Sequence, residues 1–161
     1  MAEELAAHYR EPVVEEFAVE YLEKLTRTYE YDDLRHIAIG QLIIQNRKHQ
    51  QAKNLLVLDT DLTVIKIWGE YKFGNTDPFI DNLLKTNLAG LYLLMDVDLP
   101  YEHSPLRENP DLDERKELFA LYEKLLKKLQ VPYVIISGSE KERTRKAISA
   151  VDSFLETQKS H

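Results

Sequence analysis

The sequence contains no cysteine, only five glycines and a single tryptophan among its 161 residues. Without cysteine, a disulfide framework, a thiolate metal site and a cysteine nucleophile are all excluded. The sequence also has no run of about 18 apolar residues, the length that a membrane-spanning helix needs. Its N-terminus is acidic where a secretion signal carries basic residues. These absences predict a cytoplasmic protein that does not insert into a membrane.

Basic residues are also in the minority, because Lys and Arg number 21 against 28 Asp and Glu, a formal net charge of −7. Domains that bind nucleic acid or an anionic membrane usually carry a basic surface, so the composition argues against both partners. Hydrophobic residues make up 43% and charged residues 30%, which is ordinary for a globular protein. The length and the lack of a Gly/Ser-rich linker predict a single domain over residues 1–161.

Four short apolar runs predict β-strands. Three of them are nearly continuous, as in strands that are covered on both faces of a parallel sheet. These three are residues 54–59, 91–95 and 132–136, and a shorter run is residues 12–15.

Between these runs, apolar residues recur with the spacing of one helix face, around residues 34–44, 118–129 and 147–155. Asp32 and Asp33 suit the first turn of the first of these helices. Ser139, followed three residues later by Glu142, forms a capping box for the last. Alternating strands and helices predict an α/β fold with right-handed crossovers. The basic residues Lys141, Arg143, Arg145 and Lys146 are expected on the solvated face of the last helix.

The segment at about residues 96–113 departs from this pattern, since it has three prolines, dense charge and no apolar period. Such segments are typical of long functional loops, and we expect a lid-like loop here. Arg107 lies in its middle, where an arginine can stabilise the charge of a phosphate in transfer. Taken alone, the pattern favours an exposed pairing of Arg107 with Glu108 or Asp111.

Two carboxylates, Asp59 and Asp61, follow the apolar run at residues 54–58. Ligands of α/β sheets gather at the carboxyl ends of strands, where an aspartate can hold a magnesium ion bound to nucleotide phosphates. Asp61 alone is equally suited to cap the following helix, but the pair together favours a functional role. Asp96 and Asp98 repeat the spacing after the next strand, where hydrogen bonding within the loop is the simpler interpretation.

Three further side chains are candidates for a substrate site. Trp68 and Tyr71 follow Asp61 by seven and ten residues on the expected helix, roughly on one face, and can stack on a ligand ring. Core packing is the more common role of a single aromatic residue. Glu16 lies just after the shortest apolar run and can accept a hydrogen bond from a substrate hydroxyl, although a solvated helix face is the usual explanation.

Taken together, these segments resemble the P-loop kinases related to the ribosylnicotinamide kinase domain of NadR-type NAD-salvage proteins. The likeness runs from about Ala2 to Phe154 and is most specific at residues 96–111. It implies a three-layer α/β fold with a mainly parallel sheet, and a kinase that uses ATP and Mg²⁺ to phosphorylate a nucleoside-like small molecule. The matching segments are residues 12–25, 31–42, 56–74, 91–111 and 132–148.

The resemblance also implies roles for individual residues. Asp59 would belong to the magnesium site, and Asp61 would contact or deprotonate the ribose hydroxyl of the substrate. Arg107 would lie over the transferred phosphate of ATP, and Gly138 would lie near its adenine. The residues implied near the nucleoside are Glu16, Trp68 and Tyr71.

The sequence departs from this family pattern at two points. Val19 stands where the family usually has an arginine that helps at the substrate or phosphate site. The phosphate-binding motif Gly-x-x-x-x-Gly-Lys-Ser/Thr does not occur in the 161 residues. With it we expect the first, central strand to be missing, between the strands that end near Asp59 and Met95. A misassigned start, a truncation or a natural degenerate member would each explain these departures.

The sequence therefore predicts an ATP-dependent kinase of the ribosylnicotinamide type, impaired in this chain by the missing loop. The alternative is a non-catalytic module that binds a nucleotide or a partner, with a homo-oligomer formed through the open sheet left as one outcome.

Overall fold

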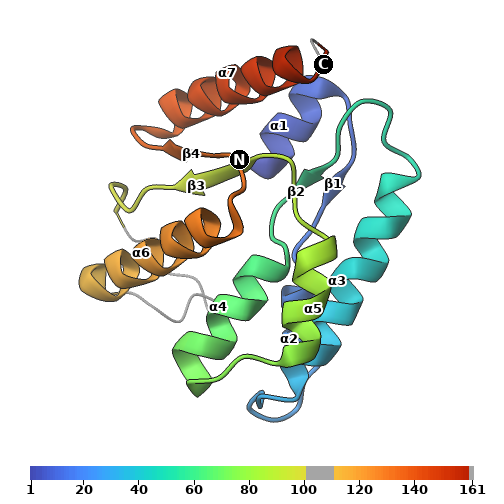
Figure 1. The fold of residues 1–161 in the computed structure, drawn as a ribbon, viewed down its shortest axis with the longest axis vertical. Helices are drawn as coiled ribbons and strands as arrows, with labels where there is room; N and C mark the ends of the chain where they lie inside the picture. Colours follow the sequence, from blue (N-terminus) through green and yellow to red (C-terminus); the bar gives the residue numbers. More distant parts are fainter. Residues whose placement is uncertain (101–110, 160–161) are drawn as a thin grey trace. The chain divides into compact units, whose positions relative to one another are not determined.

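A computed structural model describes residues 1–100 and 111–159. Helices alternate with short strands along these residues (Figure 1), which confirms the predicted mixed α/β class. None of the helices in the two described ranges is both long and apolar enough to cross a membrane. The strands are β1 (Val13–Val14), β2 (Val57–Leu58), β3 (Tyr92–Met95) and β4 (Tyr133–Ile136). The helices are α1 (Ala2–Tyr9), α2 (Phe17–Glu23), α3 (Asp33–His49), α4 (Leu62–Phe73), α5 (Pro78–Thr86), α6 (Leu112–Leu129) and α7 (Glu140–Lys159).

The strands form two parallel ladders. β1 pairs with β2, with Val14 opposite Leu58, and β3 pairs with β4, with Met95 opposite Ile136. All four predicted strands are present, each shorter than its apolar run. Among the described strands no ladder joins β2 to β3.

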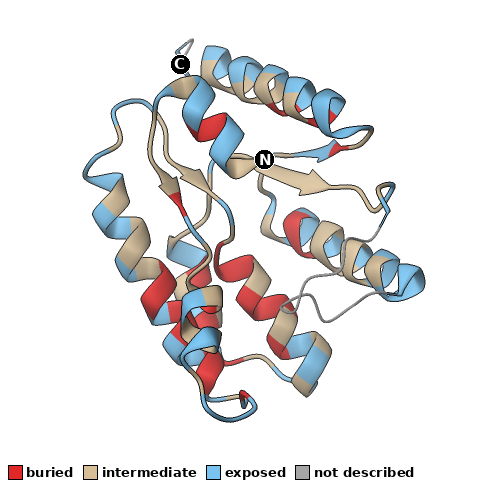
Figure 2. Cartoon of the chain, turned by 180° about the vertical axis from the view of Figure 1, so that it is seen from behind, coloured by how far each residue is buried: buried red, intermediate tan, exposed pale blue. Residues whose placement is uncertain are grey.

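The chain divides into two compact units. The N-terminal unit, Ala2–Leu88, is organised around α3, which contacts α2, α4, α5 and β1, while α1 packs on β1 and β2. The buried side of α3 and α4 is visible in Figure 2. Burying each large aliphatic side chain of this core contributes about 1.5–3 kcal/mol. The most deeply buried aliphatic side chains are Val14, Leu34, Ile37, Leu62, Ile67, Ile80 and Leu84.

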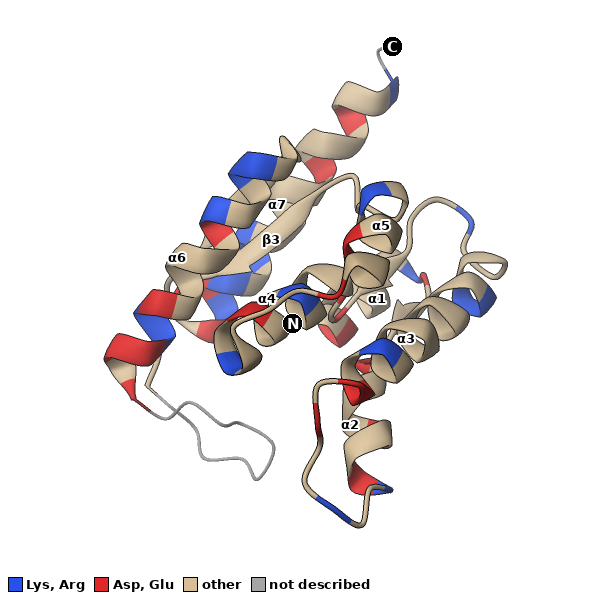
Figure 3. Ribbon diagram, turned by 60° about the horizontal axis from the view of Figure 1, so that its bottom comes forward, with Lys and Arg blue, Asp and Glu red and all other residues tan. Residues whose placement is uncertain are grey.

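The C-terminal unit comprises Ala89–His161 together with Met1. Its β3–β4 ladder lies between two helices, with α6 packed on β3 and α7 packed on β4 (Figure 1). Ile136 and Ala147 are fully buried between these elements. Acidic and basic residues alternate along the exposed side of α6 (Figure 3). One half of the predicted capping box is confirmed, since Glu142 accepts a hydrogen bond from the Ser139 N–H at 2.9 Å. The Ser139 hydroxyl also donates to the Glu142 carboxylate, at 2.7 Å.

The end of the predicted lid-like loop lies at the start of α6. Asp111 caps this helix, because its Oδ1 accepts hydrogen bonds from the N–H groups of Asp113 at 2.8 Å and Glu114 at 3.1 Å. The loop therefore ends about two residues earlier than predicted. Arg107 lies outside the described residues.

Helix α5 is one of the elements that the apolar pattern missed. The sequence nevertheless contains a helix-start signal, Asp77 followed by Pro78 at the first helical position. In the structure Asp77 caps the helix by accepting a hydrogen bond from Phe79 N–H at 2.8 Å. Arg35 on α3 then donates two hydrogen bonds to the Asp77 carboxylate, at 2.8 and 2.9 Å, which joins α5 to α3.

Helix α3 passes so close to Phe17 that position 40 has no room for a side chain. A Cβ atom at Gly40 would lie 2.0 Å from Cε1 of the Phe17 ring. We expect Gly40→Ala to lower the free energy of unfolding by about 2 kcal/mol, since overpacking costs about 1–3 kcal/mol and outweighs the gain in helix propensity. Urea denaturation measures this change. Combining it with Phe17→Leu should restore part of the loss, and a Gly40→Ala chain as stable as the wild type would contradict the close approach.

Candidate functional site

Carboxylates from two neighbouring strands meet at one edge of the N-terminal unit. The chain leaves β1 into Glu16 and leaves β2 into Asp59 and Asp61. Because the strands are parallel and Val14 pairs with Leu58, Glu16 and Asp59 follow at the same edge of the ladder. The structure therefore brings together Glu16 and Asp59, two of the residues that the sequence singled out, and Asp61 follows two residues after Asp59.

Glu16 is half-buried and lies at the N-cap position of α2, yet its side chain makes no capping hydrogen bond. Burial and the nearby negative charge of Asp59 both raise the pKa of the Glu16 carboxyl. With the described residues this carboxylate forms neither a hydrogen bond nor an ion pair, whereas the adjacent Glu15 pairs with Lys48 at 3.4 Å. A half-buried carboxylate beside a second one is unfavourable, and such groups concentrate at functional sites.

Asp59 is exposed and its main chain continues the ladder, because its N–H donates to the Val14 carbonyl at 2.9 Å. Its side chain is therefore accessible to a ligand at the end of β2. Across the described ranges, no three His, Asp or Glu side chains gather closely enough to hold a metal ion. A magnesium ion at Asp59 would take its other oxygen ligands from nucleotide phosphates and water, as Mg²⁺ commonly does.

Asp61 is the N-cap residue of α4 and only 6% exposed. Its Oδ1 accepts a hydrogen bond from Thr63 N–H at 2.8 Å and another from the Thr63 hydroxyl. Helix capping, one of the two interpretations of Asp61 from the sequence, is thus what this oxygen does. A cap of this kind stabilises a helix by about 1 kcal/mol and holds the carboxylate in one orientation.

A buried glutamine joins the two loops that carry these carboxylates. Gln41 on α3 is 1% exposed, and its Nε2 donates hydrogen bonds to the carbonyl oxygens of Glu15 and Thr60, both at 3.2 Å. Its Oε1 accepts a hydrogen bond from Phe17 N–H at 2.8 Å. Sequence analysis did not single out this residue. The sequence feature that could have identified Gln41 is that a polar side chain occupies an apolar position on the buried face of the helix.

Trp68 and Tyr71 lie on α4 as predicted, and both are half-buried. The Trp68 ring stacks on Tyr29, with centroids 6.1 Å apart and planes at 25°. Tyr29 also contacts Phe73 edge-on, and the Lys72 ammonium lies 3.8 Å from its ring centroid. Packing thus accounts for one face of Trp68. The helical rise places Trp68 about 10 Å along the axis from the Asp61 cap.

Gly138 lies in the C-terminal unit, in the loop after β4, with a φ of 103°. Its N–H donates to Asp98 Oδ2 at 2.6 Å, and its carbonyl accepts from Arg143 Nε at 2.9 Å. The main-chain N–H of Gly138 is thus used within the protein and is not available to an adenine ring. The Gly138 N–H, together with Arg143, lowers the pKa of Asp98.

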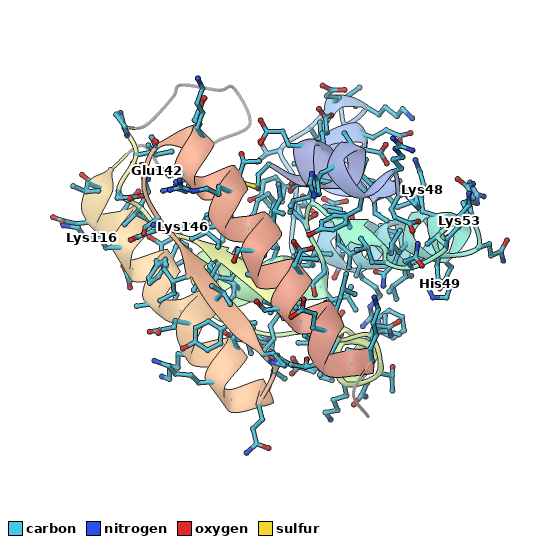
Figure 4. The ribbon with its side chains drawn as sticks, turned by 90° about the horizontal axis from the view of Figure 1, so that it is seen from above. Lys48, His49, Lys53, Lys116, Glu142 and Lys146 are labelled. Atoms are coloured by element: carbon cyan, nitrogen blue, oxygen red, sulfur yellow. The ribbon has the colours of Figure 1, made fainter. Side chains whose placement is uncertain are left out.

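The prediction that Arg143 lies on the solvated face of α7 is wrong. This side chain is 6% exposed; it donates to the Asp96 carbonyl at 2.8 Å and forms an ion pair with Asp98. Its neighbour Lys146 does lie at the surface, near Glu142 in the first turns of α7 (Figure 4), and donates to the Ser137 carbonyl at 2.8 Å. Arg143 instead joins the loops that follow β3 and β4.

One segment comes close to the phosphate-binding motif in sequence. Gly69, Gly74 and Thr76 have the spacing of its glycines and its Ser/Thr, but Asn75 stands where the motif has lysine. The structure makes this segment the end of α4, with Gly74 as C-cap at a φ of 66°. A helix C-terminus presents carbonyl oxygens, whereas phosphate binding needs N–H groups. This segment is therefore not a phosphate-binding loop.

Parallel strands with acidic side chains at their carboxyl ends, separated by helices, are the architecture of α/β nucleotide-binding domains. Comparison with protein-family models identifies the family: the model described as AAA domain matches residues 1–143. The chain belongs to this family of P-loop NTPase-like domains, which generally bind a nucleotide with Mg²⁺. No curated protein matches the sequence.

Proposed function

We propose that the protein is an ATP-dependent small-molecule kinase of the ribosylnicotinamide type, which phosphorylates a nucleoside-like hydroxyl and serves NAD salvage. The observation that carries the proposal is the meeting of Glu16 and Asp59 at the carboxyl edge of the β1–β2 ladder, with Asp61 two residues further along the chain. Membership of a nucleotide-binding family supports the use of ATP. The resemblance over residues 12–25 and 91–111 supports a nucleoside-like acceptor.

In this proposal one carboxylate binds the metal ion and the other two contact the substrate. Asp59 holds Mg²⁺, which when bound neutralises charge on the phosphates. Glu16 and Asp61 face the substrate hydroxyl. Since the raised pKa of Glu16 suits proton uptake better than a helix-capping carboxylate does, Glu16 is the better placed of the two to accept the hydroxyl proton. The remaining assignments are Trp68 and Tyr71 beside the nucleoside, Arg107 over the phosphate and Gly138 beside adenine.

Turnover by these 161 residues should be slow. The sequence contains no Gly-x-x-x-x-Gly-Lys-Ser/Thr motif, whose N–H groups and lysine cradle phosphates in kinases of this type. Val19 also replaces an arginine expected near the substrate. The proposed activity is therefore measured most sensitively as product accumulated over long incubations.

The Asp59→Asn variant tests the proposal. Incubation with Mg-ATP and nicotinamide riboside should yield the phosphorylated nucleoside with the wild-type chain. We expect Asp59→Asn to lower the rate at least about 100-fold, because the charge that holds the metal is removed. The matched control is Asp113→Asn, which changes a side chain that is 92% exposed on α6. Equal turnover by wild type and Asp59→Asn would remove Asp59 from the mechanism.

The second candidate is a non-catalytic module that binds a nucleotide or a partner protein. It is favoured by the missing motif and by the shortness of each ladder, since among the described residues β1 pairs only with β2 and β3 only with β4. Thermal unfolding with and without saturating Mg-ATP separates the two. A nucleotide at 100 times its Kd stabilises by about 2.7 kcal/mol, a shift in Tm of about 5–10 °C. A shift without phosphate transfer would support the nucleotide-binding module, and a stable dimer without a shift would support the partner-binding one.

A further inference from the structure

The β1–β2 ladder is too short to fix the loops that follow it. Each strand contributes only two residues to the ladder, Val13–Val14 and Val57–Leu58. Side chains therefore have to hold the chain at both ends of the strands. At the amino end, Glu11 does this by accepting hydrogen bonds from Lys53 N–H at 2.9 Å and Asn54 N–H at 2.8 Å.

At the carboxyl end of the two strands, Gln41 holds the chain by side-chain hydrogen bonds, as Glu11 does at the amino end. It reaches from α3 to both loops at once, bonding Glu15 and Phe17 on either side of Glu16, and Thr60 between Asp59 and Asp61. Both of its N–H groups and its oxygen are used, which accounts for the burial of a polar amide. The three hydrogen bonds span 19 to 26 residues of sequence, so nothing local replaces them.

The start of α2 shows that Glu16 is not used as a helix cap. The first N–H groups of a helix need acceptors. The Phe17 N–H, at the first helical position, donates to Gln41, and Glu16 makes no capping bond to the N–H groups that follow. In this respect the carboxylate of Glu16 differs from that of Asp61, which caps its own helix.

We propose that Gln41 is a positioning residue, which holds the loops after β1 and β2 in register and so sets where the Glu16 carboxylate meets the substrate. The part of this inference that concerns substrate binding by Glu16 rests on the proposed function. The part that concerns the geometry of the two loops does not. The close packing of α3 at Gly40, where Phe17 occupies the place of a side chain, supports the same contact from the neighbouring position.

The test compares Gln41→Met, which keeps the length of the side chain, with Gln45→Met one turn along the same helix. Amide hydrogen exchange followed by NMR measures the Phe17 N–H without any ligand. We expect it to exchange at least about tenfold faster in Gln41→Met and unchanged in Gln45→Met. Gln41→Glu keeps an acceptor for this N–H but loses both donors, and should retain most of the protection. Unchanged Phe17 exchange in Gln41→Met would overturn the inference.

The second measurement separates positioning from stability. Binding of nicotinamide riboside with Mg²⁺, followed by amide shifts in residues 15–17 and 59–61, should weaken about tenfold or more in Gln41→Met and in Gln41→Glu. Ile37→Val, a buried change one turn before Gln41 on α3 that lowers stability but leaves the hydrogen bonds of Gln41 in place, should leave the affinity unchanged. Faster Phe17 exchange with unchanged affinity would show that Gln41 is only structural. Absence of binding to the wild type would instead contradict the proposed substrate. The hydrogen-exchange result would still test whether Gln41 holds the loop at Phe17.

Discussion

Replacing Arg143 by methionine is expected to lower the free energy of unfolding by about 3 kcal/mol. The side chain is buried, and it satisfies the carbonyl oxygens of Asp96 and Gly138 as well as the carboxylate of Asp98. Removing one member of a buried ion pair costs about 3–5 kcal/mol, because the partner groups lose their donors. The lower end applies here, since Asp98 is partly exposed and can recover water.

The control is Arg145→Met, which makes the same change two residues along α7 at an exposed position. We expect it to alter stability by no more than about 0.5 kcal/mol. Arg143→Lys keeps the charge but cannot reach all three acceptors with one ammonium group, so it should fall between methionine and the wild type. Urea denaturation of the four proteins gives the comparison, and equal stability of Arg143→Met and Arg145→Met would contradict a buried anchoring role.

The burial of Arg143 could not be predicted from the sequence. Its neighbours Lys141, Arg145 and Lys146 are exposed, and the charge pattern gave no sign that one of four basic residues turns inward. Its burial depends on acceptors that lie 45 to 47 residues earlier, after β3. Spacing along a helix predicts a face but not which distant carbonyl groups that face will meet.

The strands and the start of α7 were predicted well because they depend on residues that are close together in the sequence. The apolar runs gave all four strands, and the Ser139–Glu142 box gave the start of α7. The acids Asp59 and Glu16 could be placed at a strand end from the runs alone. Gln41 could not, since its three partners are brought to it only when α3 packs across both loops. Within the site, the acidic groups could be predicted from the sequence, whereas tertiary packing decides which of them form hydrogen bonds within the protein.

Asp33 carries the other large effect on stability. It is 2% exposed at the start of α3, and its carboxylate accepts two hydrogen bonds from Arg27, at 2.7 and 2.9 Å, and one from the Tyr21 hydroxyl at 2.7 Å. Glu30 N–H donates a further bond at 2.7 Å. We expect Asp33→Ala to lower the free energy of unfolding by about 3 kcal/mol, because Tyr21 and Glu30 N–H lose a buried acceptor and the half-exposed Arg27 loses its partner.

The same network makes this contribution depend on pH. The hydrogen bonds from Arg27, with those from Tyr21 and Glu30 N–H, hold the pKa of Asp33 well below its usual range. A carboxyl whose pKa is depressed on folding stabilises the protein above its unfolded pKa of about 3.9. That stabilisation is lost as the pH falls through the lower folded value. The difference in stability between wild type and Asp33→Ala should thus be constant above about pH 5 and shrink below about pH 4.

The preceding residue provides a matched control for both parts of this prediction. Asp32 is the N-cap residue of α3, but it is exposed and its side chain makes no capping hydrogen bond. Asp32→Ala should therefore change the stability little and leave its pH dependence as in the wild type. Urea denaturation of the three proteins between pH 3 and pH 7 tests the pair. A stability difference for Asp33→Ala that stays constant down to pH 3 would contradict the depressed pKa, even if the loss at pH 7 is as large as expected, and would assign the loss to packing and neutral hydrogen bonds alone.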